Sequence, residues 1–91
     1  MDRFTVLLSS HAQLYCKKTG RKTSELLKDC FEHLEENPFH HPGGRIKKLA
    51  GQHHLYRFRI GDLRVIYEIN ELKRDVIVHL ISPRGDAYKK I

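Results

Sequence analysis

The fold is decided by residues 56–69, which read Tyr56-Arg57-Phe58-Arg59-Ile60-Gly61-Asp62-Leu63-Arg64-Val65-Ile66-Tyr67-Glu68-Ile69. Gly61-Asp62 is predicted to form a two-residue hairpin loop, because glycine in the first loop position suits a type II′ turn. Residues that pair across the two flanking strands share one face of the sheet. The loop sets these pairs as Ile60 with Leu63, Arg59 with Arg64, Phe58 with Val65, Arg57 with Ile66, and Tyr56 with Tyr67.

This register separates the side chains into two faces of different chemistry. The face expected to pack on helices is apolar or aromatic throughout and consists of Tyr56, Phe58, Ile60, Leu63, Val65, Tyr67 and Ile69. The other face is expected to be solvated and carries Arg57, Arg59, Arg64, Ile66 and Glu68. A slip of one residue would turn the arginines into the core, so the register is strongly specified.

Arg57, Arg59 and Arg64, named here the arginine cluster, are unfavourable for folding. Arg59 lies directly opposite Arg64, and like charges across a strand pair repel. An anion-binding site explains the arrangement, because guanidinium groups offer planar, bidentate donors that suit phosphate. The alternative is that acidic neighbours neutralise the cluster, but Glu68 lies at the far end of this face and can serve one arginine rather than three.

Two helices are predicted before the hairpin. Residues 4–8 read as a short strand, Ser9 offers a helix N-cap, and a short helix is expected over residues 10–18. A longer helix is expected over about residues 22–36, because Pro38 disfavours a helical residue before it. Its apolar side chains form one amphipathic stripe, which consists of Leu26, Leu27, Cys30, Phe31 and Leu34.

Three β segments are predicted in the second half of the chain. Residues 39–44 form a loop, and residues 45–51 lead into strands at 55–60, 63–69 and 76–81, which are rich in β-branched and aromatic side chains. This order of elements predicts a single α+β domain over residues 1–91. We expect an N-terminal strand and a helical hairpin packed on a twisted antiparallel sheet of about four strands.

The charge of the chain is concentrated in its second part. The formal net charge is +6. Residues 1–38 hold six basic and six acidic side chains, whereas residues 39–91 hold eleven basic and five acidic ones. A localised positive field favours an anionic partner, with nucleic acid first among the candidates. The alternative is a solvated basic surface that aids solubility.

Composition argues against several classes of protein. No apolar run approaches the roughly 20 residues of a membrane span, and the N-terminus lacks the layout of a signal peptide, so a cytoplasmic location is expected. Cys16 and Cys30 fall in the predicted helices and are expected to be structural thiols.

The seven histidines show no metal-ligand spacing, so neither a metal nor another cofactor is expected. His79 could act as a general acid or base, although its position within a strand favours a structural role.

The C-terminal segment offers a second candidate group. Ser82-Pro83 can open a helical turn, with serine as cap and proline in the first position. On such a turn Arg84 and Tyr88 are neighbours four residues apart, although Gly85 weakens the helical prediction. The alternative is a frayed tail with a tyrosine anchored in the core.

The chain resembles the RelE/ParE superfamily of bacterial and archaeal toxins over nearly its whole length. The resemblance rests on the order and spacing of several pieces, which are Glu36-Asn37-Pro38, Ile46-Lys47-Lys48-Leu49-Ala50-Gly51, Tyr56-Arg57-Phe58-Arg59, Arg64-Val65-Ile66-Tyr67-Glu68-Ile69, and Arg84 followed by Tyr88. It implies a helical hairpin on a twisted antiparallel sheet, in agreement with the pattern of elements above.

The resemblance also implies an activity. RelE members cleave mRNA on the ribosome without a metal, by attack of the RNA 2′-hydroxyl on the adjacent phosphate. The positions that are basic or tyrosine in RelE correspond to Arg57, Arg59, Arg64, Arg84 and Tyr88, which implies that these five are catalytic. RelE has lysine at the first two positions, and relatives often have His or Lys where this chain has Pro83. The spacing from Arg84 to Tyr88 is also shorter than in RelE itself. Arginine stays protonated, so the identity of the general base is open.

The implied partners are the ribosome, mRNA and a cognate antitoxin, RelB-like or other, that forms a hetero-oligomer with this chain; no membrane partner is implied. RNA or the ribosome would be held electrostatically by four lysines, which are Lys47, Lys48, Lys89 and Lys90. Two other functions are compatible with the resemblance. One is inhibition of DNA gyrase without nuclease activity, as ParE members perform, and the other is an inactive toxin that only binds its antitoxin.

Overall fold

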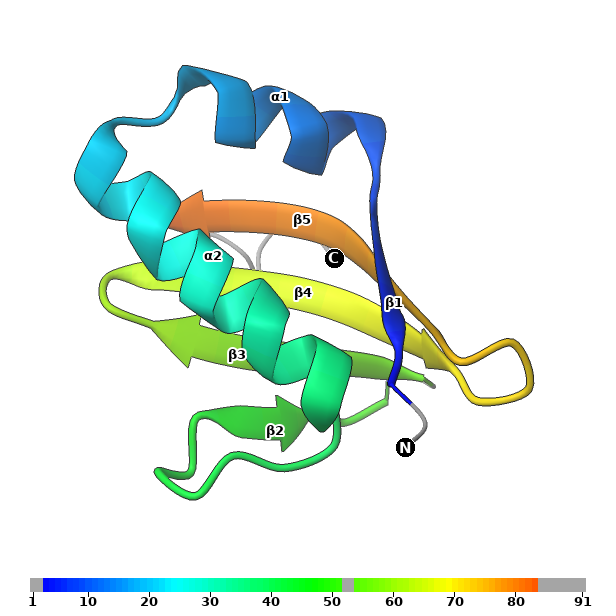
Figure 1. The fold of residues 1–91 in the computed structure, drawn as a ribbon. Helices are drawn as coiled ribbons and strands as arrows, with labels where there is room; N and C mark the ends of the chain where they lie inside the picture. The colour runs from blue at the N-terminus through cyan, green and yellow to red at the C-terminus, as the bar shows by residue number, and fades with distance from the viewer. Residues whose placement is uncertain (1–2, 52–53, 84–91) are drawn as a thin grey trace.

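A computed structural model of the chain describes residues 3–51 and 54–83. The elements in chain order are β1 (Thr5–Leu8), α1 (Ser10–Lys18), α2 (Arg21–Glu36), β2 (Ile46–Lys48), β3 (Leu55–Ile60), β4 (Leu63–Asn70) and β5 (Asp75–Pro83). Both helices lie on one face of a single sheet, with α2 across its middle and α1 beside β5 (Figure 1). The expected α+β architecture is therefore confirmed.

The five strands lie in the order β1-β5-β4-β3-β2, and β1 runs parallel to β5. The structure corrects the expected sheet in two details. It has five strands rather than about four, because Ile46–Lys48 pairs with β3. It is mixed rather than antiparallel, because β1 enters at the edge beside β5 and the helices then cross the sheet face. Pattern within a strand does not specify its neighbour, so the sequence left this pairing open.

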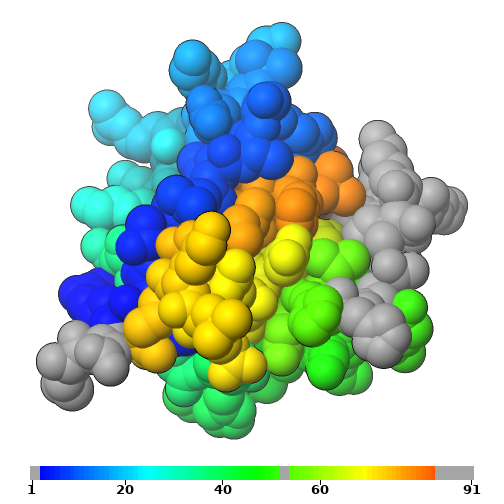
Figure 2. All heavy atoms as spheres, turned by 90° about the vertical axis from the view of Figure 1, so that its right-hand side faces the viewer, coloured from blue at the N-terminus to red at the C-terminus, as the bar shows by residue number. Residues whose placement is uncertain are grey.

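The hairpin between β3 and β4 has the predicted register. Arg59 pairs with Arg64 and Ile60 with Leu63, and the pairing continues without a shift to Leu55 and Glu68. Gly61 has φ 58°, a left-handed conformation that a two-residue type II′ loop requires and that glycine adopts without steric cost. At the other end of the sheet, the turn between β4 and β5 projects into solvent (Figure 2).

One core lies between the helices and the sheet. Leu27, Cys30 and Leu34 of the predicted α2 stripe are buried against the apolar face of the hairpin. Phe58, Val65 and Tyr67 form the centre of that face and are almost inaccessible to solvent. The hydroxyl of Tyr67 donates a hydrogen bond of 2.6 Å to the carbonyl oxygen of Pro38, which ties the end of α2 to the central strand. The prediction that one face of the hairpin packs in the core is therefore confirmed.

Helix α1 starts where the sequence predicts. The Ser9 hydroxyl accepts a hydrogen bond of 3.1 Å from the backbone N–H of Ala12, as an N-cap does. The same hydroxyl donates to the carbonyl oxygen of His79 at 2.8 Å, so the cap also fixes α1 to β5. Within the described ranges, no helix has the length and apolar character needed to cross a membrane.

Both cysteines are free and lie in helices that face the core. Burial raises the pKa of the Cys30 thiol, and Cys16 adds to this effect. Burial also raises the pKa of Cys16. A raised pKa removes the thiolate that reactive cysteines need, which supports the structural interpretation of both residues.

Candidate functional site

The arginine cluster lies on the face of the sheet that points away from the helices, named here the outer face. The cross-strand pairs define two neighbouring rows on it. The row nearest the hairpin loop consists of Arg59, Arg64 and Ser82, and the next consists of Lys47, Arg57, Ile66 and Leu80. Arg57 is the diagonal neighbour of Arg64, at a distance that long side chains span. The fold thus gathers the three arginines that the sequence placed together.

The outer face is less exposed than the sequence suggested. Arg57 is 9% exposed and Arg64 is 8% exposed, and Ile66 between them is buried, whereas Arg59 is exposed. The expectation of a solvated face is therefore wrong for its centre. Strand β4 is the middle strand of five, so neighbouring strands flank Arg64 and Ile66 on both sides. A pattern of alternating residues cannot report this, because it does not reveal which strand is central.

Arg64 is a buried cation, and two of its three side-chain nitrogen atoms make no hydrogen bond within the described part of the chain. Its Nε and Nη1 atoms are inaccessible to solvent and have no hydrogen-bond acceptor among residues 3–51 and 54–83. Neither Arg64 nor Arg59 forms an ion pair with a carboxylate of those residues. Leaving a buried charged donor unsatisfied is costly. An anion that enters beside Arg64 would remove this cost, which makes the outer face a candidate anion site.

Glu68, the acid expected to neutralise part of the cluster, has a different partner. Its Oε1 atom lies 2.9 Å from Nε2 of His79, and both side chains are partly exposed on the outer face. The sequence had favoured a structural role for His79 and had not connected it with Glu68. The contact depends on the pairing of β4 with β5, which no spacing in the sequence reveals.

The predicted site residues outside the arginine cluster separate into three groups. Lys47 pairs with Arg57 and belongs to the outer face, whereas Lys48 pairs with Tyr56, whose side chain belongs to the opposite face. Both lysines are exposed. The remaining predicted site residues, Arg84, Tyr88, Lys89 and Lys90, lie outside the described residues.

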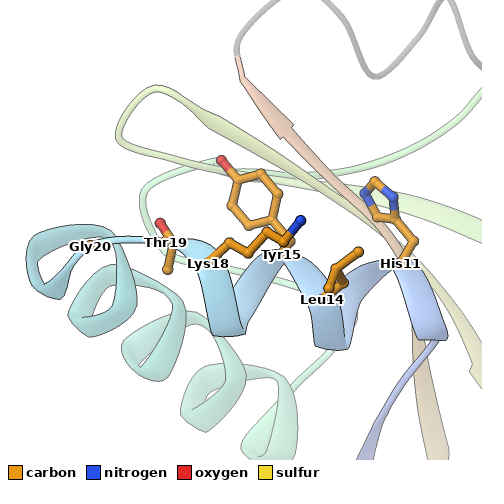
Figure 3. Close-up of a pocket in the computed structure, with 6 residues that line it drawn as sticks. All are labelled: His11, Leu14, Tyr15, Lys18, Thr19 and Gly20. Carbon is orange, nitrogen blue, oxygen red and sulfur yellow. The ribbon is translucent and has the colours of Figure 1, made fainter.

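A surface hollow of ≈ 470 Å³ lies on α1 and the turn that follows it, away from the arginine cluster. Its lining consists of His11, Leu14, Tyr15, Lys18, Thr19 and Gly20 (Figure 3). The ring of His11 is hydrogen-bonded at 3.0 Å to the carbonyl oxygen of Ile81, and its aromatic neighbour Tyr15 lies 6.5 Å away between ring centroids. None of the residues predicted for the site lines this hollow, so it is not the candidate phosphate site.

Comparison with known proteins identifies the family. Residues 8–88 match the model of a family described as the ParE toxin of type II toxin–antitoxin systems. A Methanocaldococcus jannaschii protein that carries the RelE1 toxin name is 40% identical over 62 residues, which make up 68% of this chain and 69% of that relative. The chain belongs to this ParE toxin family and thus to the RelE/ParE superfamily of type II toxins.

Solved structures agree with this assignment. A chain of the archaeal RelE–RelB complex from Pyrococcus horikoshii superposes with a TM-score of 0.80 at 26% identity, over 96% of this chain and 100% of that chain. The isolated E. coli RelE toxin has the same fold, with a TM-score of 0.74 at 21% identity, over 96% of this chain and 93% of that chain. The resemblance predicted from the sequence is confirmed at the level of fold and family.

Proposed function

We propose that this toxin is a metal-independent endoribonuclease that cleaves mRNA on the ribosome and so inhibits translation. The observation that carries the proposal is Arg64, whose buried Nε and Nη1 atoms have no acceptor among the described residues. It lies beside Arg59 and Arg57 on one face. A phosphodiester supplies the negative charge and the acceptor oxygens that these two Arg64 atoms lack among the described residues.

In the proposed reaction the 2′-hydroxyl oxygen attacks the neighbouring phosphorus and the bond to the 5′-oxygen breaks. Arg57, Arg59 and Arg64 hold the phosphate and stabilise the extra negative charge of the pentacovalent transition state. Donors placed in advance at a site of developing charge are commonly worth about 2.7–4 kcal/mol each. Arg84 would contact the phosphate or assist the leaving 5′-oxygen. Tyr88 would orient the 2′-hydroxyl, stack on a base or relay a proton.

The substrate is long and polyanionic, so contacts beyond the scissile phosphate are expected. Lys47 extends the row of Arg57 to the edge of the sheet and is exposed there. Together with Lys89 and Lys90 it would hold RNA through the phosphate backbone, whereas Lys48, on the opposite face, would contact the ribosome. Such contacts release counterions and make binding dependent on salt.

A protein antitoxin is the second proposed partner. RelB accompanies RelE in the Pyrococcus horikoshii complex to which this chain is similar, and a Methanococcus jannaschii structure is described as a RelB–RelE antitoxin–toxin complex. We infer that a cognate antitoxin forms a hetero-oligomer with this chain. Acidic side chains of that antitoxin facing the arginine cluster would complement its charge and keep RNA away from it.

The competing function is inhibition of DNA gyrase without cleavage of RNA. The family description favours this candidate, because the matched model is that of the ParE toxin. In that case the arginine cluster would bind a protein or DNA surface rather than a reacting phosphate. Purified protein added to gyrase and relaxed DNA separates the two functions, since only a gyrase inhibitor blocks supercoiling while mRNA stays intact.

The direct test is a pulse of expression in growing cells, followed by primer extension on abundant messages. The endoribonuclease predicts cuts within translated codons, and Arg64→Ala should abolish both the cuts and the arrest of growth. Arg21→Ala is the matched control, because Arg21 is exposed at the start of α2. Arrest of growth with intact messages would reject the proposed function. Unimpaired growth at high expression would instead indicate an inactive toxin.

A further inference from the structure

Strand β5 contains one residue that has no partner on β4. Ile66 pairs with Leu80 and Tyr67 pairs with Val78, so His79 is the extra residue of a β-bulge. Bulges often turn a side chain toward a functional site. Here the bulge places His79 and Leu80 in succession between two buried core residues, Val78 and Ile81. A regular strand would have turned one of these two toward the helices.

The bulge brings the ring of His79 to Glu68 on the outer face. Nε2 of His79 lies 2.9 Å from Oε1 of Glu68. An ionised carboxylate can only accept a hydrogen bond, so Nε2 carries the proton in this pair. In the neutral ring, Nδ1 then has the free lone pair. This is the arrangement in which a carboxylate selects the tautomer of a catalytic histidine and stabilises its protonated form.

The pair is close to the arginine cluster. Glu68 is two residues along β4 from Ile66, the direct partner of Arg57, so Arg57 and Glu68 are diagonal neighbours on the outer face. Arg57 is also the diagonal neighbour of Arg64. Diagonal neighbours of this kind lie about 7–8 Å apart, within the reach of long side chains. Arg57 lies on β3, across β4 from His79, and Ile66 separates Arg64 from Glu68 along β4, so the His79–Glu68 pair borders the cluster.

We propose that His79 is the general base of the toxin, held in position by Glu68. The inference rests on the proposed endoribonuclease function. Nδ1 of His79 takes the proton from the RNA 2′-hydroxyl, the 2′-oxygen forms its bond to phosphorus, and the bond from phosphorus to the 5′-oxygen breaks. The electron pair of that bond stays on the 5′-oxygen, which is protonated by solvent. The products are a 2′,3′-cyclic phosphate and a 5′-hydroxyl.

This assignment supplies a group that the arginine cluster lacks. Guanidinium groups stay protonated and cannot accept a proton near neutral pH. Among the described residues, the charged groups on the outer face around His79 are Glu68, Arg57 and Asp75, while β1 on its other side contributes none. A surface ion pair of a purely structural kind would contribute only about 0–1 kcal/mol to stability. Removing such an ion pair by substitution would not change the pH dependence of cleavage.

The test measures single-turnover cleavage of mRNA on purified translating ribosomes between pH 5.5 and 8.5. His79→Gln should lower the rate by about 10²–10⁴-fold and abolish the rise of the rate with pH seen in the wild type. Glu68→Gln keeps the size of the side chain but removes the carboxylate that fixes the tautomer of His79, so it should also lower the rate while leaving the fold intact. Added imidazole should restore part of the activity of His79→Ala. His40→Gln, an exposed loop position, is the control and should match the wild type.

The outcomes test the role of His79 separately from the proposed endoribonuclease function. If the wild type cuts and His79→Gln cuts at the same rate with the same pH profile, the general base is another group and the proposed function stands. If the wild type cuts no mRNA, both are rejected. Thermal unfolding of each variant, which should change little for partly exposed side chains, separates loss of chemistry from loss of fold. Imidazole rescue provides the same separation without reference to stability.

Discussion

Arg59 and Arg64 face each other as direct cross-strand partners, and neither forms an ion pair with a described residue. The two differ in burial: Arg64, on the central strand, is 8% exposed, whereas Arg59, on β3, is exposed. Like charges in direct opposition lower stability. The pair therefore opposes the fold that contains it, and substitutions there should separate stability from activity.

Arg64→Met should stabilise the protein and inactivate it. The substitution keeps much of the side-chain volume and removes a buried charge with unsatisfied donors, so the free energy of unfolding should rise by about 1 kcal/mol or more. Urea unfolding measures this change, and primer extension measures the loss of cleavage. Arg21→Met should change neither. A variant that is less stable than the wild type would show that Arg64 has a compensating partner.

Arg59→Glu should also raise stability and lower function, but through a different mechanism. It replaces a like-charge pair by an opposite-charge pair, which contributes about 0.2–1 kcal/mol across two strands. The free energy of unfolding should rise by at least that amount, while binding of a short RNA should be lost. Lys73→Glu makes the same change of net charge at the exposed turn after β4, and it should leave RNA binding largely intact. Equal losses of binding in the two variants would point to net charge alone.

Lys47 and Lys48 offer a test of which face meets RNA. The two are adjacent and exposed on β2, but only Lys47 shares the outer face. Lys47→Ala should reduce the slope of log binding constant against log salt by about one. Lys48→Ala should leave the slope closer to that of the wild type. Fluorescence titration of a labelled RNA at several salt concentrations makes the comparison, and a reversed order would place RNA on the other face.

Gly61→Ala should destabilise the hairpin. Gly61 has φ 58°, and an added Cβ would lie 3.1 Å from Cδ1 of Leu26 on α2. A non-glycine residue in this backbone region costs about 1–3 kcal/mol. Gly20→Ala is the control, because an added Cβ there meets nothing within 4 Å and φ is −78°. Thermal unfolding should show a clear fall in Tm for the first variant and little change for the second.

Tyr67→Phe should destabilise the core without disturbing its packing. The Tyr67 hydroxyl donates a buried hydrogen bond to the carbonyl oxygen of Pro38, and its loss leaves that oxygen without the donor. Removing one partner of a buried hydrogen bond costs about 1–3 kcal/mol. Tyr56→Phe serves as control, because the Tyr56 ring stacks on Tyr67 but its hydroxyl makes no hydrogen bond within residues 3–51 and 54–83. Urea unfolding should rank Tyr67→Phe as clearly the less stable.

The hairpin is the part of this protein that the sequence by itself determined. Gly61-Asp62 sets a turn of known length, and alternation along fourteen residues then specifies the register from Tyr56 to Tyr67. The Ser9 cap of α1 and the apolar stripe of α2 are local in the same way. Interactions within about ten residues along the chain govern all of these features, so they can be read before the fold is known.

Only the tertiary structure decided which residues are buried on the outer face and which meet one another. Arg64 is buried on the central strand, and β4 is central because β1, from the far end of the chain, pairs beside β5. The bulge that brings His79 to Glu68 likewise depends on how β5 aligns with β4. These features come from contacts between segments distant in sequence. Burial and electrostatic pairing depend on such neighbours, and the periodicity of one strand carries no record of them.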